Sequence, residues 1–574
     1  MLPYARMYLS SVLRRTGVVV LAITLAVVLT YPLAFKLDSV GRIDSGDGQW
    51  SLWCVTWVAH ALTSDPANLF NANIFYPHRY TLAYSEANIV PGILGIPAYL
   101  ITGNPFATHN SVVLLAFIFS FLTAYGLARY LTDSTAAGIL CGIAFAYCPF
   151  IFARTAHIQL LMTFGIPWAM HMLHRLVDRP TFPRAFALSA TLIVQALACA
   201  YYGVFAGLSV ALAVLYYAQT RRLWKNGKYW FLVGLSAATA VSIVAPFFVP
   251  YQYVQGELGF TRTLKDAAMY SADWKAWFAS SAWTHRWMLP LLRRWSEVLF
   301  PGFMIGILGL AGVIVALRWR RPQDEVDRLN ETASLPRETV TFYSIVGVIA
   351  LWASFGPKAW LYTVLFHTIP VFSFLRAPAR FGIMVTLVLS LGLAFLIARL
   401  LNGRTIRAQA LATVPLAFAL ACELATIPLG MTEAEPVNVA YRLLANLRRG
   451  PVVELPFFYE RPDFPRHAEY MLNSTFHWQP LINGYSDHIP QDFRAIVLPM
   501  SSFPTRQSFE ILRRRDTRYV VIHLGGYDER SVVHLQERLE RYKEHLALLS
   551  RKDDVLLYEI VSWPAASSGP PQME

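Results

Sequence analysis

The sequence predicts a mostly α-helical membrane protein, a polytopic bundle of about eleven transmembrane helices followed by a small C-terminal α/β domain. Of its 574 residues, 55% are hydrophobic and only 15% are charged, which excludes an ordinary soluble protein. The apolar residues fall into separate runs that are long enough to cross a bilayer. The 16 Trp, 28 Tyr and 36 Phe fit the aromatic belts found at membrane surfaces.

The first apolar run follows Arg6, Arg14 and Arg15 and contains no small-residue cleavage site. We therefore expect an uncleaved first helix whose N-terminus lies in the cytoplasm. Ten further runs have roughly the length that a span of about 20 residues requires. The eleven predicted spans are 17–35, 110–127, 136–152, 160–176, 186–201, 203–217, 229–249, 301–317, 340–355, 381–400 and 408–426.

The orientation depends on the stretch 186–217, which is too long for one span and is interrupted at Tyr201, Tyr202 and Gly203. Basic residues flank both of its ends, so the positive-inside rule predicts two crossings here. The short apolar run 88–102 contains two prolines and is expected to lie in the outer interface. The C-terminal part is then outside the cytoplasm, which in the inner membrane of a bacterium means the periplasm.

The chain divides into a predicted membrane module, 1–429, and a predicted periplasmic α/β domain, 430–561. The first outer segment, 36–109, is long and polar, which calls for a functional explanation. Residues 562–574 are rich in Pro, Ser and Gly and are expected to be disordered. In the C-terminal domain, strand-like and helix-like patterns follow one another: strands are predicted at 452–455, 519–523 and 555–561, and an amphipathic helix at 530–545.

The string Asp44-Ser45-Gly46-Asp47-Gly48 places two carboxylates in a glycine-rich turn directly after the first span. The alternative is a simple turn at Asp47 and Gly48 that the Asp44 side chain caps. Tryptophans follow at helical spacing and predict a helix along the membrane surface, with its indoles in the headgroup layer. These tryptophans are Trp50, Trp53 and Trp57.

Glycosyl transfer from a lipid phosphate needs a base for the acceptor hydroxyl and cations for the departing phosphate. Asp47 is the first candidate for the base and Asp44 the second. Arg376 and Arg380 lie four residues apart at the outer start of a span and are candidates for binding the donor phosphate. The alternative is that these arginines extend from the interface to water.

Other polar residues on the predicted outer surface are candidates for substrate binding, or alternatively interfacial caps. Glu297 either contacts substrate or stabilises a helix N-terminus. No metal site is assigned, because two carboxylates are well short of the about six oxygen ligands that a hard cation takes. Mg²⁺ or Mn²⁺ stays open as a cofactor. The remaining candidates are His60, His78, Glu86, His157 and Gln159.

Together these features resemble the GT-C superfamily of integral-membrane glycosyltransferases, within it the bacterial branch that carries a Gly-Asp motif in the first outer loop. The resemblance implies donors of the polyprenyl-phosphate-sugar class, a helical bundle with juxtamembrane helices in the first loop, and a catalytic role for Asp47. The tail lacks the Trp-Trp-Asp motif of oligosaccharyltransferases, and the first loop lacks the Asp-Glu pair of protein mannosyltransferases. The matching features are the acidic string, the predicted interfacial helices 49–62 and 88–102, the tract 71–85, the ends of the second and third spans at 128–131 and 146–149, and 375–381.

The resulting hypothesis is an inverting glycosyltransferase that acts at the periplasmic face on a polyprenyl-phosphate sugar, with membrane lipids around it. Its acceptor, a glycan, lipid or protein, is left open. The alternatives are a transporter or flippase of a lipid-linked glycan and a non-catalytic envelope-assembly protein. Nucleic acid is not an expected partner, because the net charge of +13 belongs to no soluble basic domain with a recognition motif.

Overall fold

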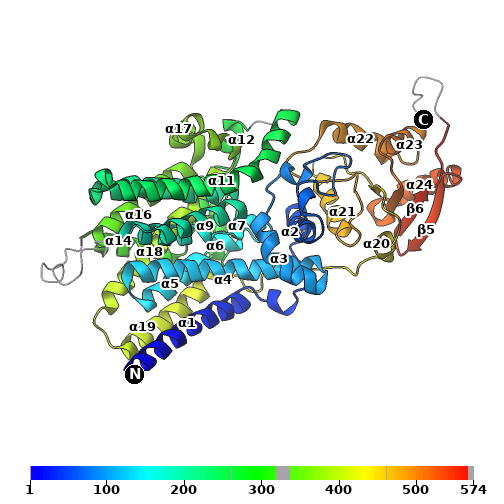
Figure 1. Ribbon diagram of the computed structural model, residues 1–574. Helices are drawn as coiled ribbons and strands as arrows, with labels where there is room; N and C mark the ends of the chain where they lie inside the picture. The colour runs from blue at the N-terminus through cyan, green and yellow to red at the C-terminus, as the bar shows by residue number, and fades with distance from the viewer. Residues whose placement is uncertain (1, 260–261, 319–335, 461, 566–574) are drawn as a thin grey trace. The chain divides into compact units, whose positions relative to one another are not determined.

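The computed structural model describes residues 2–259, 262–318, 336–460 and 462–565 (Figure 1). It contains two compact units. The helical unit comprises Met1–Phe35, Ser111–Val249 and Phe260–Gly430, and the mixed unit comprises Lys36–Asn110, Pro250–Gly259 and Met431–Glu574. The first outer segment thus shares a compact unit with the tail. The domain boundary expected after residue 429 stays a prediction, and most of the expected disordered tail, 566–574, lies outside the described residues.

Each of the eleven predicted spans is helical in the described part of the chain. The runs 136–152 and 160–176 are each divided into two helices, and the first break occurs where Pro149 holds Cys148 in an extended conformation. The helices are α1 Leu2–Leu29, α4 Pro105–Thr132, α5 Thr135–Ala146, α6 Pro149–Phe152, α7 Ile158–Leu161, α8 Gly165–Asp178, α9 Phe182–Ala198, α10 Ala200–Thr220, α11 Gly227–Leu258, α14 Phe303–Arg318, α16 Pro336–Ser354, α18 Gly382–Leu401 and α19 Ile406–Leu424. Shorter helices are α12 Leu264–Met269, α13 Leu289–Leu292 and α17 Leu361–Thr368.

Among the described residues, six helices are long and apolar enough to cross a membrane. Of the most apolar 18-residue stretch of α18, 78% is buried within the protein. The buried share of the corresponding stretch is 17% in α11 and 11% in α19. Helix α18 therefore belongs to the protein core, whereas α11 and α19 leave apolar surface that lipid must cover. The chain is a membrane protein, as the composition predicts.

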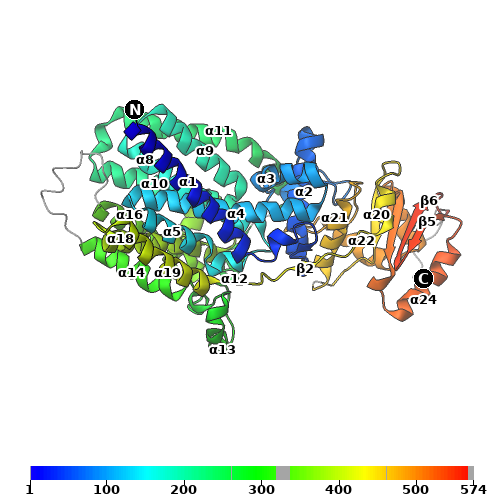
Figure 2. The same cartoon turned by 90° about the horizontal axis from the view of Figure 1, so that it is seen from below.

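Small residues bring α14 and α18 into close contact. A Cβ atom added to Gly312 would come within 1.9 Å of the carbonyl oxygen of Gly392, and one added to Gly309 within 2.4 Å of that of Leu389. Such close approach is how membrane helices gain packing energy. Helices α14 and α5 both contact α18, and Figure 2 shows the three close together.

The mixed unit combines the helices of the first outer segment with the tail. A short antiparallel pairing of β1 Val40–Gly41 with β2 Thr432–Glu433 joins the two parts. Helix α2 Gly46–Ser64 packs against α3 Ile89–Thr102 and against α21 His467–Ser474 of the tail. The other tail helices are α20 Val439–Leu444, α22 Gln491–Ser501, α23 Arg506–Arg514 and α24 Glu529–Arg541.

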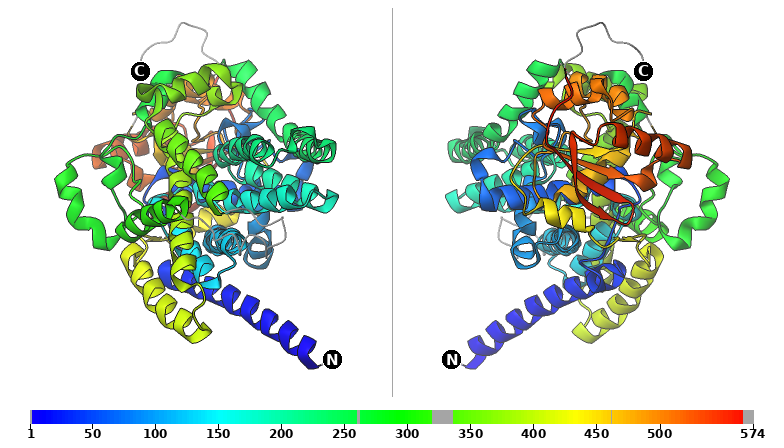
Figure 3. Two further views of the ribbon diagram at one scale, coloured as in Figure 1. Left: turned by 90° about the vertical axis from the view of Figure 1, so that its left-hand side faces the viewer. Right: turned by 90° about the vertical axis from the view of Figure 1, so that its right-hand side faces the viewer.

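The tail sheet has the strand order β3-β4-β6-β5. Strands β3 Val452–Leu455 and β4 Tyr519–His523 are parallel, and β6 Val555–Ile560 is antiparallel to β4 and to β5 Leu546–Lys552 (Figure 3, right). The three predicted strands are confirmed. The predicted helix 530–545 is too long, since α24 ends at Arg541 and the chain turns into β5, a strand that the sequence prediction missed.

A buried ion pair connects the two parallel strands. Glu454 of β3 is fully buried, and its Oε2 lies 2.7 Å from Nε2 of His523 and accepts a 2.7 Å hydrogen bond from the Tyr441 hydroxyl. Burial alone would lower the pKa of His523, but the hydrogen bond to Glu454 and the charge of that carboxylate raise it above its ordinary value of 6.5.

This ion pair predicts a pH-dependent stability. Because the pKa of His523 is higher in the folded protein than in the unfolded chain, the stabilisation is fully present below pH 6.5 and is lost as the pH rises through the folded-state pKa. Urea unfolding between pH 6 and pH 9, followed by far-UV circular dichroism, should show this loss for the wild type. A Glu454→Gln variant should show a smaller loss, and equal pH profiles for both proteins would contradict the assignment.

Candidate functional site

Asp47 lies in the first turn of α2, where free backbone N–H groups favour a negative charge. Ser45 is the N-cap, and its side chain accepts a 3.2 Å hydrogen bond from the Gly48 N–H. The prediction that Asp44 caps this turn is therefore wrong. Asp44 instead pairs with Arg42, whose Nε lies 2.9 Å from Oδ1, and this hydrogen bond lowers the pKa of Asp44.

The two glycines beside Asp47 are required by close packing. A Cβ atom on Gly48 would come within 1.7 Å of the carbonyl oxygen of Arg42, and one on Gly46 within 2.6 Å of the Pro465 side chain. Any larger residue at either position would displace backbone. The Gly-Asp-Gly sequence thus lets the preceding loop and the tail pack against the helix start, which fixes the position of the exposed Asp47 carboxylate.

The tail supplies a partner for Asp47. The Tyr485 hydroxyl donates a 3.0 Å hydrogen bond to Asp47 Oδ1. The neighbouring backbone is held against the first outer segment, since the His488 N–H donates to the Tyr84 carbonyl oxygen at 3.2 Å. Sequence reasoning missed Tyr485. The signal that could have found it is the polar string Gly484-Tyr485-Ser486-Asp487-His488 in an otherwise irregular part of the tail.

Two further candidates of the first outer segment, His78 and Glu86, make hydrogen bonds within the mixed unit. His78 Nε2 lies 2.8 Å from Oδ1 of Asp492, and this contact lowers the pKa of Asp492, which Arg515 also binds at 3.0 Å. Glu86 is half-buried, and its main-chain carbonyl oxygen accepts a 3.2 Å hydrogen bond from Asn88. His78 therefore links the first segment to α22.

The tryptophans of α2 are buried inside the protein, so the expectation that they lie in the lipid headgroup layer is wrong. Trp53 is 1% exposed, and its Nε1 donates to Asn73 Oδ1 at 3.1 Å. Trp57 is 8% exposed and donates to the Leu69 carbonyl oxygen at 2.9 Å. The protein itself satisfies their indole N–H groups, which removes the need for headgroup contacts.

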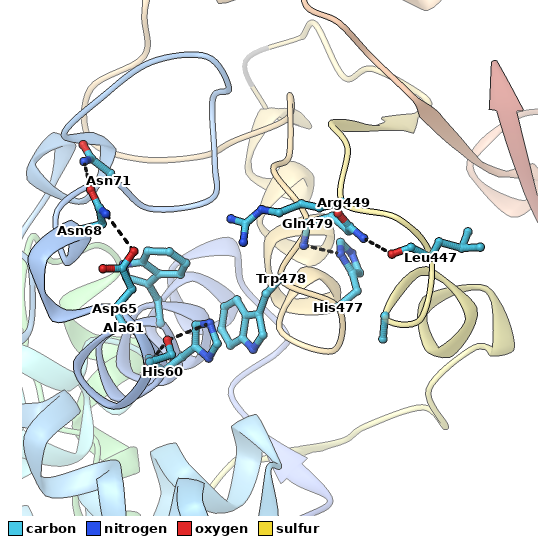
Figure 4. Close-up of a pocket in the computed structure, with 13 residues that line it drawn as sticks. His60, Ala61, Asp65, Asn68, Asn71, Leu447, Arg449, His477, Trp478 and Gln479 are labelled. Atoms are coloured by element: carbon cyan, nitrogen blue, oxygen red, sulfur yellow. Dashed lines mark hydrogen bonds between the residues drawn. The ribbon is translucent and has the colours of Figure 1, made fainter. Parts of the chain in front are cut away.

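His60 lines a pocket of about 650 Å³ between the C-terminal part of α2 and the tail (Figure 4). Its ring stacks on Trp478 with the centroids 4.3 Å apart, and its Nδ1 is 2.8 Å from the Tyr99 hydroxyl. Burial, together with the charge of Arg449, lowers the pKa of His60 to about 4. The imidazole is therefore neutral at physiological pH, and it is the one predicted site residue that borders this pocket.

In the helical unit, aromatic rings hold the two candidate phosphate-binding arginines just before α18. The Arg380 guanidinium lies over the Tyr201 ring, 4.1 Å from its centroid, and that of Arg376 lies 5.1 Å from the Tyr270 centroid. The backbone N–H of Arg376 donates to the Tyr201 hydroxyl at 2.7 Å. Both side chains are half-buried, so they are more constrained than arginines that simply extend to water.

Arg154, which sequence reasoning missed, adds a third guanidinium. It is 5% exposed, and its Nη2 donates a 2.6 Å hydrogen bond to Glu297. Burial lowers the pKa of Arg154, Glu297 opposes this effect, and the positive charge of Arg380 adds to the lowering. The nearest charged partner of Arg154 is thus the Glu297 carboxylate, and Arg380 acts on it as a second, like charge. The feature of the sequence that could have identified Arg154 is its position as a single charge directly beyond the apolar run 136–152.

Glu297 does not stabilise a helix N-terminus, as one interpretation of the sequence predicted. The carboxylate of Glu423 performs that role for α14, because it accepts hydrogen bonds from the backbone N–H groups of Phe303 and Met304, the latter at 3.1 Å.

The last two candidates, His157 and Gln159, lie at the start of α7. His157 is half-buried and immediately precedes the helix. Gln159 on α7 is 7% exposed, and its Oε1 lacks a hydrogen-bond partner within the described ranges.

The carboxylates of the first outer segment do not fit a divalent cation. In the part of the chain that the structure describes, no three His, Cys, Asp or Glu side chains form a group that could hold a metal ion. Asp44 is engaged by Arg42, and Asp47 accepts from Tyr485.

The chain shares its fold with a solved glycosyltransferase, in line with the resemblance to the GT-C superfamily seen in the sequence. The chain is similar to the mycobacterial arabinofuranosyltransferase AftD, with 15% identity over 95% of this chain and a TM-score of 0.55. It spans only 41% of that protein's chain. A family model described as a domain of unknown function, DUF6311, matches residues 19–422, and the chain belongs to this family.

Two other solved structures are more distant. The Archaeoglobus fulgidus oligosaccharyltransferase has 13% identity, with 92% of this chain and 71% of that chain covered, and a TM-score of 0.44. ArnT from Cupriavidus metallidurans has 14% identity, with 95% and 98% covered, and a TM-score of 0.43. No protein of curated function matches the chain in sequence.

Proposed function

We propose that the protein transfers a sugar from a polyprenyl-phosphate donor to an acceptor hydroxyl at the periplasmic face of the bacterial inner membrane. The observation that carries the proposal is the Asp47 carboxylate, which two glycine contacts and the Tyr485 hydroxyl hold in the first turn of α2. The GT-C fold supports the reaction class, and the distribution of basic residues supports the orientation.

The proposed reaction is a single displacement. Asp47 accepts the proton of the acceptor hydroxyl, and the hydroxyl oxygen forms a bond to the anomeric carbon of the donor sugar. The bond between this carbon and the phosphate oxygen breaks, and its electron pair leaves with the polyprenyl phosphate. Attack from the face opposite the leaving group inverts the anomeric configuration.

Arg376 and Arg380 are proposed to bind the donor phosphate, with Arg154 as an additional cation. Three features support this assignment: the arginines precede α18, aromatic rings restrict their side chains, and Arg380 is close enough to Arg154 to lower its pKa. Guanidinium groups form paired hydrogen bonds with phosphate oxygens and would stabilise the negative charge on the leaving group.

An Arg380→Ala variant is expected to raise the KM for the lipid donor about tenfold or more, because it removes a charge-assisted hydrogen bond worth about 1.5–3 kcal/mol. Steady-state kinetics in detergent with a varied donor concentration measures this change. Arg286→Ala is the matched control, since Arg286 also lies over an aromatic ring, that of Trp283, at 3.1 Å. Equal KM values for the two variants would remove Arg380 from the phosphate site.

The function itself is tested by incubating the purified protein with a panel of polyprenyl-phosphate sugars and a mixture of cell-envelope acceptors. Release of polyprenyl phosphate from one donor is the expected result. Movement of a lipid-linked glycan across a proteoliposome membrane without such release would favour a transporter or flippase instead. If envelope assembly stayed normal in the Asp47→Asn variant but failed on deletion of the tail, a non-catalytic assembly protein would be favoured.

A further inference from the structure

The pocket of the mixed unit has an aromatic wall. The Trp478 indole stacks on His60 with an interplanar angle of 11°, and it meets Trp57 edge-on at a centroid distance of 5.6 Å. Trp478 has a φ of 52°, a left-handed conformation that is unusual for a bulky side chain. Strained residues of this kind concentrate at ligand sites, where the surrounding structure holds them in place.

Polar side chains also line the pocket. Asn71 Nδ2 donates to Asn68 Oδ1 at 2.9 Å, and Asn68 Nδ2 donates to Asp65 Oδ2 at 2.8 Å. This ladder orients two amides and one carboxylate at the pocket rim. The Arg449 side chain extends into the same space from the tail (Figure 4). One positive and one negative side chain therefore line the pocket, so it favours neither a simple anion nor a simple cation.

His477 adds an unused polar group to the lining. The side chain is buried with 8% exposed, and its Nδ1 accepts a 3.0 Å hydrogen bond from the Gln479 N–H. Its Nε2 has no hydrogen-bond partner in the described part of the chain. A buried nitrogen without a partner costs free energy, which a ligand hydroxyl that reached it would recover.

We propose that this pocket is a saccharide-binding subsite for the glycan that accepts the transferred sugar. A pyranose or furanose ring has an apolar C–H face and a rim of hydroxyl groups. The C–H face would pack on the Trp478 indole, while the hydroxyls exchange hydrogen bonds with Asp65, Asn68 and Arg449. A volume of about 650 Å³ is enough for a short oligosaccharide. That the bound glycan is the acceptor rests on the proposed function, whereas saccharide binding by the pocket does not.

The test is the binding of soluble hexasaccharides to the full-length protein in detergent, measured by isothermal titration calorimetry. The probes are hexamers of glucose, mannose, galactose, arabinose, N-acetylglucosamine and galacturonic acid. At least one hexamer is expected to bind, and Trp478→Gly is expected to lower the affinity for that hexamer at least tenfold. Glycine is chosen because it adopts the φ of 52° without strain, so the variant should fold.

Arg449→Met tests the polar side independently, because Arg449 is exposed, and this variant should weaken binding several-fold. Trp224→Ala, an exposed tryptophan of the helical unit that is 51% accessible, is the control and should bind normally. Binding of no hexamer, or normal binding by Trp478→Gly, would overturn the proposal. Asp47→Asn should bind the hexamer as the wild type does, so a failure of catalysis is distinguishable from a failure of this subsite.

Discussion

An Asp47→Asn variant is expected to transfer sugar about 10²- to 10⁴-fold more slowly than the wild type, which is the usual contribution of a general base. Asparagine has nearly the same shape, and its amide oxygen still accepts the hydrogen bond that Tyr485 donates at 3.0 Å. It has no carboxylate to take the acceptor proton. The loss should therefore appear in kcat, measured with saturating donor, while the melting temperature stays close to that of the wild type.

Asp44→Asn is the matched control for this prediction. Asp44 lies three residues away in the same loop, but its carboxylate is exposed and paired with Arg42. An exposed pair of this kind is worth only about 0–1 kcal/mol, so this variant should keep its kcat. Tyr485→Phe should give an intermediate loss, since it removes only the hydrogen bond that positions Asp47. Normal kcat in Asp47→Asn, or a larger loss in Asp44→Asn, would assign the base elsewhere.

The second large effect is expected in the tail sheet. A His523→Ala variant leaves Glu454, a fully buried residue, without its ionic partner at 2.7 Å. Removing one partner from a buried ion pair costs about 3–5 kcal/mol, because the remaining charge is buried and uncompensated. Urea unfolding of the full-length protein, monitored by far-UV circular dichroism, should show this lower free energy of unfolding in the transition of the tail.

His534→Ala provides the comparison for this variant. His534 lies on α24 in the same unit and pairs with Glu537 at 3.5 Å, but both side chains are at least 66% exposed. Its replacement should change the free energy of unfolding by less than about 1 kcal/mol. A similarly small change for His523→Ala would show that the Glu454 pair contributes little to the stability of the sheet.

The helices could be predicted from the sequence because bilayer thickness sets the length of each apolar run, whatever its neighbours are. The first two tail strands match the structure residue for residue, because a short apolar run rich in β-branched residues is a local signal. The break predicted at Tyr201, Tyr202 and Gly203 is misplaced, because these residues lie inside α10 and the chain breaks at Cys199, where the backbone is extended.

The candidate site could be predicted only in part, because its partners are distant in sequence. The acidic string identifies Asp47, but Tyr485 is 438 residues away, and no periodicity indicates that contact. The tryptophan spacing on α2 predicts one face of a helix correctly. It does not indicate whether lipid or protein covers that face, and here Asn73 and the Leu69 carbonyl bind the indoles.

A glycosyltransferase that uses lipid-phosphate sugars must release polyprenyl phosphate, and this release can be measured. Purified wild-type protein and Asp47→Asn are incubated in parallel with each labelled donor and an envelope acceptor mixture, and the free polyprenyl phosphate is quantified. The wild type is expected to consume one donor and to form a product of inverted anomeric configuration, whereas the variant should release almost no polyprenyl phosphate. Release from no donor, or equal release by both proteins, would contradict the proposed function.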